Sequence, residues 1–364
     1  MIGKMSFIAL FVLLVYTLAG CSWKSETVEE KITNQLINNS IDHGIPKQSL
    51  LVIHNKNIIY HNNLNSDNTD KKSIYPIYSV TKLFASTLIM QLYEAGKLKL
   101  TDPASKYVSN LPESWKNIRI EQFLNHSSGV PEYWSFDNDE LIFPSTINEA
   151  FSLLENEPLL FLPDSQIQYT QTNYLVIKTI LENITQLPYK ELANKRIIKK
   201  LDLKDTWLGR LNVPKENLIA GYLPNSGDKL IANEVKFPDY ASSHSDAYTT
   251  LEDLGKFISS LAQGELVSKP LLIKLWQPYI LLDGDKGYFA SGWDYDTSGA
   301  WQELGHDGGG VLRVRLMFQS DLNDYYILVY LTNGNKDGVW SRTLVDSVQY
   351  YVMPDLISRL TTLF

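Results

Sequence analysis

The chain has 364 residues, of which 44% are hydrophobic, and it carries a net charge of −8 with a pI of about 5.3. This length exceeds one typical domain and the apolar content suffices for a large core, so we expect two lobes. A nucleic-acid-binding protein usually carries a basic patch, so the acidic balance argues against that class. The single cysteine, Cys21, rules out intrachain disulfides.

The first twenty residues are typical of a segment that is removed on export. A lysine near the start is followed by an apolar run over 5–15 and by small residues before Cys21, the pattern of a signal peptide. The residues L-A-G-C that end at Cys21 resemble a bacterial lipoprotein box, in which the cysteine becomes the lipidated first residue. We therefore expect a signal peptide over 1–20, a lipidated tether over 21–27, and an exported protein anchored through Cys21 to the bacterial membrane in the cell envelope.

The first half of the mature chain contains clear helix and strand patterns. Apolar residues at helical spacing predict an amphipathic helix over 28–41, which Gly44 and Pro46 end. Apolar runs at 49–54 and 58–61 flank a short polar turn and predict a β-hairpin. A long apolar-periodic helix is predicted from Ser79 to about residue 96.

The rest of the chain divides into a helical part and a late group of strands. Residues 100–244 show a helical pattern with many Pro, Asn and Tyr breaks. Three later apolar runs predict consecutive antiparallel strands, at 288–293, 311–318 and 325–331. A last helix is predicted over about 339–360. The fold class is therefore α/β of the α+β kind: an antiparallel sheet flanked by helices, formed by 28–99 and 245–364, with 100–244 as an inserted all-helical lobe.

Two histidines of the predicted hairpin are candidates for a metal-ligand pair. His54 and His61 flank the predicted turn, but no third ligand is visible, so we interpret them as ordinary surface or edge histidines. The chain has no H-E-x-x-H or C-x-x-C motif, and no G-x-G-x-x-G before a helix. No metal and no cofactor are expected.

Ser79 and Lys82 have the spacing of a nucleophile and its proton acceptor. Residues three apart are neighbours on a helix surface, and a serine at a helix start lies among unpaired N–H groups that favour an anionic oxygen. This combination suits acyl transfer through a serine ester. Taken alone, the S-x-x-K spacing favours a helix cap beside a solvated lysine, so the interpretation depends on other segments.

Four segments in this order resemble the serine β-lactamase and penicillin-binding protein superfamily. They are Y-S-V-T-K at 78–82, G-K-L-K-L-T-D-P at 96–103, L-N-H-S-S-G-V-P at 124–131 and G-H-D-G-G-G at 305–310. The chain is most similar to the class C-like branch of β-lactamases, D,D-peptidases and related esterases, from about Ile45 to about Asn335. The resemblance implies a β-lactamase/transpeptidase-like fold, with the last segment on a strand that faces the serine.

The resemblance also implies roles. Ser79 would attack a carbonyl carbon, and a buried Lys82 with a lowered pKa would accept its proton. Tyr169 would be the general acid or base, although packing at a lobe interface is an alternative for it. His306 stands where lactamases usually have lysine. The N–H groups of Ser79 and Gly309 would form the oxyanion hole.

The chain departs from the family pattern at two places. Gln171 stands where the family's Y-x-N motif has asparagine; an alternative register uses Asn173 but loses the match to Tyr169. With Asp307 and Gly308, Gln171 is our predicted substrate-binding set.

The second departure precedes a predicted helix start at Thr250, where the family's usual glycine pair is missing. His244 and Asp246 occupy this stretch. They would line the rim of the cleft or cap a helix, and we favour the cap.

The sequence thus predicts a serine hydrolase that acts through a Ser79 acyl-enzyme on an amide or ester: a peptidoglycan D-Ala peptide, a β-lactam or a small ester. Its partners would be such a small-molecule or peptidoglycan substrate and the membrane, with no nucleic acid, and the protein is expected to be a monomer. The alternative is a non-catalytic envelope lipoprotein that uses the cleft to bind muropeptides or a partner.

Overall fold

The computed structural model of the chain describes residues 25–64, 72–138, 140–223, 230–233, 235–309 and 311–353. Cys21 and the expected signal peptide lie outside these ranges, so the lipid anchor stays a prediction. Within the described ranges, no helix combines the length and the apolar character that crossing a membrane requires.

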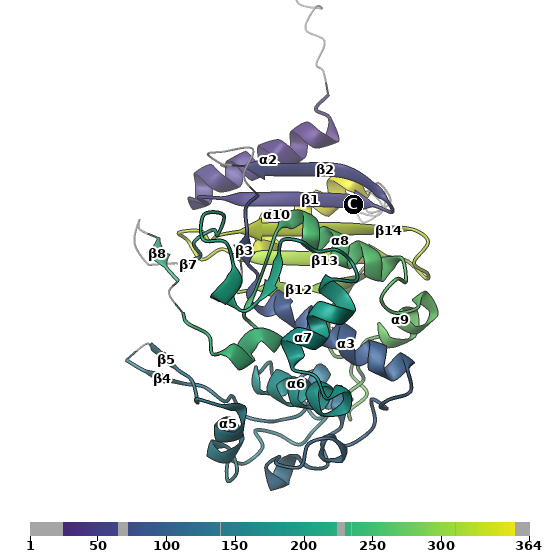
Figure 1. The fold of residues 1–364 in the computed structure, drawn as a ribbon. Helices are drawn as coiled ribbons and strands as arrows, with labels where there is room; N and C mark the ends of the chain where they lie inside the picture. Colours follow the sequence, from purple (N-terminus) through teal and green to yellow (C-terminus); the bar gives the residue numbers. More distant parts are fainter. Residues whose placement is uncertain are drawn as a thin grey trace, which may run out of the picture.

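The centre of the molecule is a seven-stranded sheet with the order β10-β11-β12-β13-β14-β1-β2, and every neighbouring pair is antiparallel (Figure 1). Its strands are β1 (Gln48–His54), β2 (Asn57–Leu64), β10 (Phe289–Ala290), β11 (Trp293–Ser298), β12 (Trp301–Gly308), β13 (Leu312–Phe318) and β14 (Tyr325–Thr332). The predicted hairpin is β1–β2, and β1 also pairs with β14 near the other end of the chain. The predicted fold class is confirmed.

Helices cover both faces of the sheet because its strands alternate apolar side chains between two cores. On one face, which we call the back face, α2 (Val28–His43) packs on β2 and α10 (Ser341–Val352) packs on β13. On the other, the front face, α8 (Leu251–Ala262) packs on β1 and β14. The predicted first helix is α2, and Gly44 ends it in a left-handed conformation (φ 58°).

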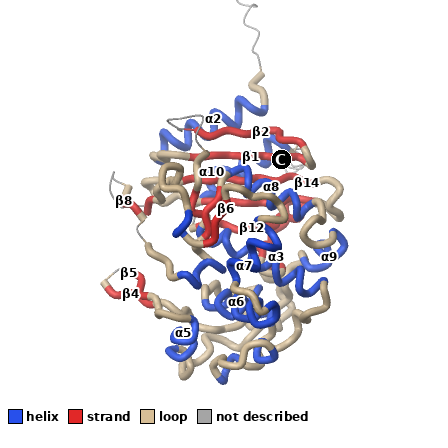
Figure 2. Tube along the Cα trace, in the orientation of Figure 1, coloured by secondary structure: helices blue, strands red, loops and turns tan. Residues whose placement is uncertain are grey.

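The front face also carries α3 (Lys82–Glu94), which runs between the sheet and the rest of the chain (Figures 1 and 2). Beyond it lie α4 (Ile120–Leu124), α5 (Ile147–Leu153), α6 (Thr172–Thr185), α7 (Tyr189–Ala193) and, near the sheet, α9 (Lys269–Leu275). The helical part is not purely helical. Short antiparallel ladders join β4 (Ser135–Asp137) to β5 (Glu140–Ile142), β7 (Tyr222–Leu223) to β8 (Ile231–Ala232), and β9 (Ala247–Thr249) to β3 (Tyr75–Pro76) and β6 (Thr206–Leu208).

Two of the three predicted late strands, 311–318 and 325–331, are confirmed as β13 and β14, and the first differs. The apolar run at 288–293 is divided between β10 and β11, because Ser291 and Gly292 both have positive φ (50° and 84°) and turn the chain. Apolar periodicity did not reveal β12; only the resemblance placed a strand there. Its acidic side chains, the buried Glu303 and the half-buried Asp307, are satisfied by ion pairs.

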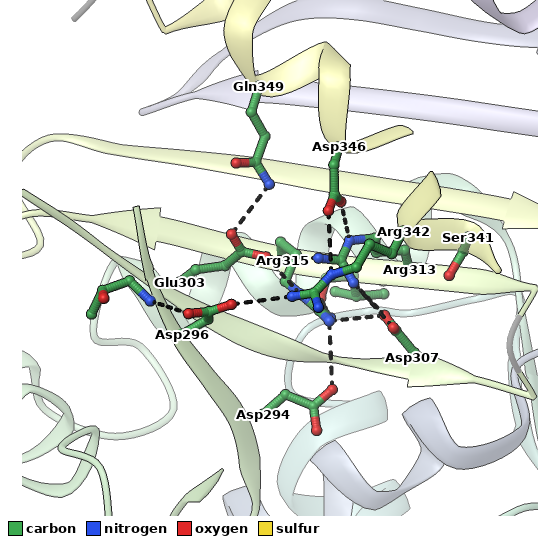
Figure 3. Close-up of polar contacts among 12 residues, drawn as sticks. Asp294, Asp296, Glu303, Asp307, Arg313, Arg315, Ser341, Arg342, Asp346 and Gln349 are labelled. Carbon is green, nitrogen blue, oxygen red and sulfur yellow. Dashed lines mark hydrogen bonds and ion pairs between the residues drawn. The ribbon is translucent and has the colours of Figure 1, made fainter. Parts of the chain in front are cut away.

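These ion pairs lie on the back face (Figure 3). Arg313, only 1% exposed, forms ion pairs with Glu303 (3.0 Å), Asp307 (3.0 Å) and Asp346 (2.7 Å). Arg315 adds Glu303 (2.8 Å) and Asp307 (2.9 Å). Because an unpaired buried charge is costly, these contacts tie β12 and β13 to α10.

Replacing Arg313 by methionine is expected to lower the free energy of unfolding by about 3–5 kcal/mol, because three carboxylates lose a buried partner. The matched control is Arg342→Met. Arg342 also pairs with Asp346 (3.4 Å) but is 59% exposed, so its loss is expected to stay below about 1 kcal/mol. Denaturant unfolding measures both; equal losses would contradict this account of the network.

Candidate active site

Ser79 lies just before α3 and not at its cap. The turn Tyr78–Thr81 is a 3-10 helix, α3 begins at Lys82, and Thr81 is the N-cap residue, without a side-chain capping bond. The prediction that Ser79 caps the long helix is therefore wrong. Tyr78 has a φ of +43°, an uncommon conformation for a residue with a side chain, and it directs the chain into this tight turn.

Lys82 is fully buried beside Ser79. Its Nζ lies 2.5 Å from Gln171 Oε1, 3.0 Å from the carbonyl oxygen of His244 and 3.4 Å from Ser79 Oγ. Burial lowers the pKa of Lys82 well below its usual 10.5, against the opposing charge of Glu132. A neutral amine has two N–H groups and one lone pair. In the protonated form Nζ donates to all three oxygens. When the amine is neutral, the two carbonyl oxygens accept its two N–H groups, and its lone pair can accept the proton of the Ser79 hydroxyl.

Tyr169 completes this group from the other side. Its hydroxyl is hydrogen-bonded to Ser79, and its ring centroid lies 4.8 Å from Lys82 Nζ. The ring stacks on His126 at 4.4 Å between centroids. Although 36% of the residue is exposed, desolvation raises the pKa of Tyr169 well above its usual 10.0. The phenol therefore keeps its proton near neutral pH and is a donor.

Gln171, and not Asn173, contacts the lysine. The N–H of Gln171 donates to Glu132 Oε2 at 3.0 Å, which fixes the backbone so that the longer amide reaches Lys82. Asn173 instead accepts a hydrogen bond from Ser128 Oγ (2.6 Å) and donates one to His126 Nδ1 (2.9 Å). The preferred register therefore agrees with the placement of these side chains.

His306 is brought into the site from β12. Its ring lies edge-on to Tyr169 at 5.9 Å between centroids, and its Nδ1 is 2.7 Å from the carbonyl oxygen of Asp307. A carbonyl only accepts, so Nδ1 carries the hydrogen and Nε2 is an acceptor, without a partner among the described residues. Burial lowers the pKa of His306, so the imidazole is neutral near pH 7. It supplies an acceptor where the family's lysine would supply a positive charge.

Asp307 is not brought into the site by its side chain. Neighbouring residues of a strand point to opposite faces, so Asp307 lies on the back face while His306 lies on the front. There its carboxylate pairs with Arg313 and Arg315 (Figure 3). Only its carbonyl oxygen contributes, by orienting His306.

The glycines after Asp307 let β12 approach the nucleophile turn. A Cβ on Gly308 would lie 2.6 Å from the carbonyl oxygen of Ile77, and one on Gly309 would lie 3.4 Å from the Tyr78 ring. Gly309 also has a φ of +56°, which favours glycine. This close approach is compatible with the oxyanion hole predicted at Ser79 and Gly309.

His244 was misassigned from the sequence. It is fully buried, its carbonyl oxygen accepts from Lys82, and its ring contacts Tyr133 (3.1 Å) and Ser245 (2.6 Å). The helix that follows, α8, is capped by Thr250. His244 therefore neither caps this helix nor lines a rim, and no sequence motif announces a role that a backbone carbonyl performs.

Sequence reasoning also left His126 and Glu132 without a role. His126 lies in the segment 124–131 that carried part of the resemblance, and that position was the available signal. It is buried under Tyr169, and its Nδ1 accepts from the N–H of Thr170 (3.2 Å). Glu132 holds the Gln171 backbone.

The hairpin histidines lie elsewhere. His54 contacts Asp324 (2.7 Å) and His61 contacts Glu252 (2.9 Å), both at exposed positions. In the part of the chain that the structure covers, no group of three or more His, Cys, Asp or Glu side chains has a metal-binding arrangement.

Comparison with known proteins identifies the family. The Beta-lactamase family model matches residues 28–344, so the chain belongs to the Beta-lactamase family. Penicillin-binding protein 4* of Bacillus subtilis (strain 168) is 22% identical over 325 residues, which cover 83% of this chain and 71% of that protein. Protein flp of Staphylococcus aureus (strain MW2) is 24% identical over 246 residues, 63% of this chain, and the match spans about half (49%) of that protein.

Solved structures have the same fold. The octameric penicillin-binding protein homologue from Pyrococcus abyssi superposes with a TM-score of 0.73 at 21% identity, covering 91% of this chain and 77% of that one. The D-amino acid amidase from Ochrobactrum anthropi SV3, complexed with L-phenylalanine amide, superposes with a TM-score of 0.72 at 21% identity, covering 89% and 99%. The predicted family resemblance is confirmed.

The lowered pKa of Lys82 predicts a pH-dependent stability. Between its folded pKa and the usual 10.5, the unfolded chain binds a proton on Lys82 that the folded chain lacks, so this residue's contribution to stability rises with pH. The free energy of unfolding of the wild type is expected to rise relative to that of Lys82→Met as the pH rises toward the usual pKa of 10.5. Denaturant unfolding at several pH values measures this. The exposed Lys97→Met is the control, and a pH-independent difference for Lys82→Met would contradict the lowered pKa.

Proposed function

We propose that the protein is a serine hydrolase that cleaves an amide or ester through an acyl-enzyme on Ser79. The observation that carries this proposal is the environment of Lys82, whose Nζ meets two carbonyl oxygens and the Ser79 hydroxyl. The Ser79 Oγ attacks the substrate carbonyl carbon while its proton passes to the Lys82 lone pair. The N–H groups of Ser79 and Gly309 receive the developing oxyanion, and such donors contribute about 3–4 kcal/mol each.

Tyr169 serves the second half of the reaction in this proposal. Its phenol keeps its proton, so it donates to the leaving amine or alkoxide as the carbonyl bond to that group breaks. Lys82, now protonated, gives its proton to the Tyr169 phenolate, which restores both the phenol and the neutral amine. A water then attacks the acyl carbon, releases the acid and restores the Ser79 hydroxyl.

The substrate class is inferred from chemistry and from the relatives. Their names include penicillin-binding proteins, D-amino acid amidases and a hydrolase with promiscuous acyltransferase activity. For this chain we propose D-alanyl peptides of peptidoglycan, small amides or esters, or β-lactams. The neutral His306 places no fixed positive charge opposite Ser79, so the carboxylate that D-alanyl peptides and β-lactams both carry would need a cation elsewhere.

Incubation with a fluorophosphonate or a fluorescent penicillin is expected to label Ser79, as peptide mapping by mass spectrometry would show. Ser79→Ala should lose the adduct and at least about a thousandfold of the hydrolysis of p-nitrophenyl esters, amides or nitrocefin. Ser86→Ala, a buried serine one turn further along α3, is the control and keeps the adduct. The non-catalytic alternative would be favoured if the folded wild type showed neither adduct nor turnover, and if wild type and Ser79→Ala bound muropeptides equally well.

Tyr169→Phe keeps the ring on His126 and removes only the hydroxyl group, which is the proton donor. Hydrolysis of an anilide or peptide amide is expected to fall about 10²- to 10⁴-fold, the usual contribution of a positioned proton donor. A p-nitrophenyl ester of the same acid should lose much less, because its leaving group departs without a proton. Steady-state kinetics on the pair measure the difference. Tyr288→Phe, at a 54% exposed tyrosine, is the control, and equal losses on amide and ester would refute this role.

A further inference from the structure

A cavity lies next to the 3-10 turn Tyr78–Thr81, which carries Ser79. It has a volume of about 720 Å³, and Pro76 and Tyr78 form one wall. Tyr78 directly precedes Ser79, and its ring packs against Gly309 on the other side. One side chain therefore separates this cavity from the atoms predicted to hold the oxyanion.

The opposite wall of the cavity is positively charged. Arg210, Lys215 and Lys236 line it, and none of the described lining residues is acidic. The ion pairs found among the described residues involve other lysines and arginines. These three exposed cations have no ion-pair partner among the described residues, so the described lining of the cavity is positively charged, whereas the chain carries a net charge of −8.

The backbone positions Arg210 without neutralising it. The Asp246 carboxylate accepts a hydrogen bond from the backbone N–H of Arg210, and the carbonyl oxygen of Asp246 accepts one from Gly209 at 2.6 Å. No ion pair joins the guanidinium to this carboxylate. Arg210 therefore starts from a fixed backbone, and its guanidinium has no ion-pair partner among the described residues. Its planar fork fits a carboxylate or a phosphate.

Contacts of Tyr78 connect the cavity to the site. Its hydroxyl receives a hydrogen bond from Asn233 Nδ2 at 3.3 Å. A Cβ on Gly221 would lie 2.2 Å from the same oxygen, so only glycine leaves room for it. Burial raises the pKa of Tyr78, and the hydrogen bond from Asn233 and the charge of Arg210 act against this shift.

We propose that this cavity binds an anionic group of the substrate, a carboxylate or a phosphate, while the substrate carbonyl lies at Ser79. The inference rests on the proposed function and adds to it the substrate class. Val213, Leu218 and Phe237 line the cavity beside the cations and contact the carbon chain that carries the anion. Electrostatic recognition here complements a catalytic group whose own side chains are neutral.

The test compares acyl groups that differ only in their terminal charge. The substrates are p-nitrophenyl esters of a neutral acid, of a dicarboxylic acid of equal length, and of a phosphate-bearing acid of equal length. The measured quantity is the ratio of kcat/KM for each anionic ester to kcat/KM for the neutral ester. This ratio is expected to fall about tenfold in the triple variant Arg210→Gln, Lys215→Gln, Lys236→Gln, because each exposed cation contributes a few-fold. The anionic ester whose ratio falls more identifies whether the cavity prefers a carboxylate or a phosphate.

A matched control separates the cavity from net charge. The triple variant Lys97→Gln, Lys99→Gln, Lys199→Gln removes the same charge from exposed positions elsewhere and should keep the wild-type ratio. Added salt should lower the ratio in the wild type and have little effect in the cavity variant, because exposed charges are screened. Equal ratios in wild type and cavity variant, or an equal fall in the control, would overturn the proposal.

Direct binding tests the cavity apart from catalysis. Calorimetry measures the binding of inorganic phosphate and of glutarate to Ser79→Ala protein. This variant is expected to bind at least one of the two anions saturably. The same variant with the three cavity substitutions is expected to bind neither. Binding without hydrolysis of any ester would reject the acyl-enzyme and keep the cavity proposal. Hydrolysis with neither binding nor a change in the ratio would reject the cavity alone.

Discussion

The site depends on one constraint: Lys82 is buried where a positive charge is expensive. The helix it begins is buried at every position from 82 to 92, because α3 passes between the sheet and the helical part of the chain. Its amine is shielded from solvent, and among the described residues its hydrogen-bond partners are two carbonyl oxygens and the Ser79 hydroxyl. Desolvation makes the lysine a base. Because the two carbonyl oxygens accept the N–H groups of the neutral amine, its lone pair is directed toward the Ser79 hydroxyl.

The same desolvation sets the protonation of the surrounding groups. Burial lowers the pKa of His126, His244 and His306 and raises that of Tyr169, so the imidazoles are neutral and the phenol is protonated. The strong charges are held on the back face, where β12 places Asp307 against Arg313 and turns His306 forward. The alternation of a single strand thus separates an ionic network, which stabilises the sheet, from a neutral catalytic group.

The parts of this arrangement that the sequence predicted are those with local signals. Helical spacing gave α2, apolar runs gave the β1–β2 hairpin, and ordered motifs located Ser79, Lys82, Tyr169 and His306, which the structure brings together. Strand β12 was missed by periodicity because Glu303 and Asp307 are polar, and ion pairs with Arg313 and Arg315 on the neighbouring strand β13 make their burial tolerable. His244 was misassigned because it acts through a carbonyl oxygen, which any residue has. The fit of Gln171 depended on the contact of its backbone with Glu132, a tertiary contact that a motif does not encode.

A neutral catalytic group has a consequence for selectivity. Where a cation faces the nucleophile, the same residue can help the chemistry and recognise a charged substrate; here His306 offers only an acceptor. Selection of an anionic substrate must then come from charges outside the catalytic group but within reach of a bound substrate. The cavity beside Tyr78 meets both conditions, since Arg210 lies on its wall and Tyr78 adjoins Ser79. Because its cations are exposed, they are screened by salt and are free to change without disturbing Lys82. Because substrate recognition and proton transfer use different residues, the substrate preference can change while the desolvation that makes Lys82 a base is preserved.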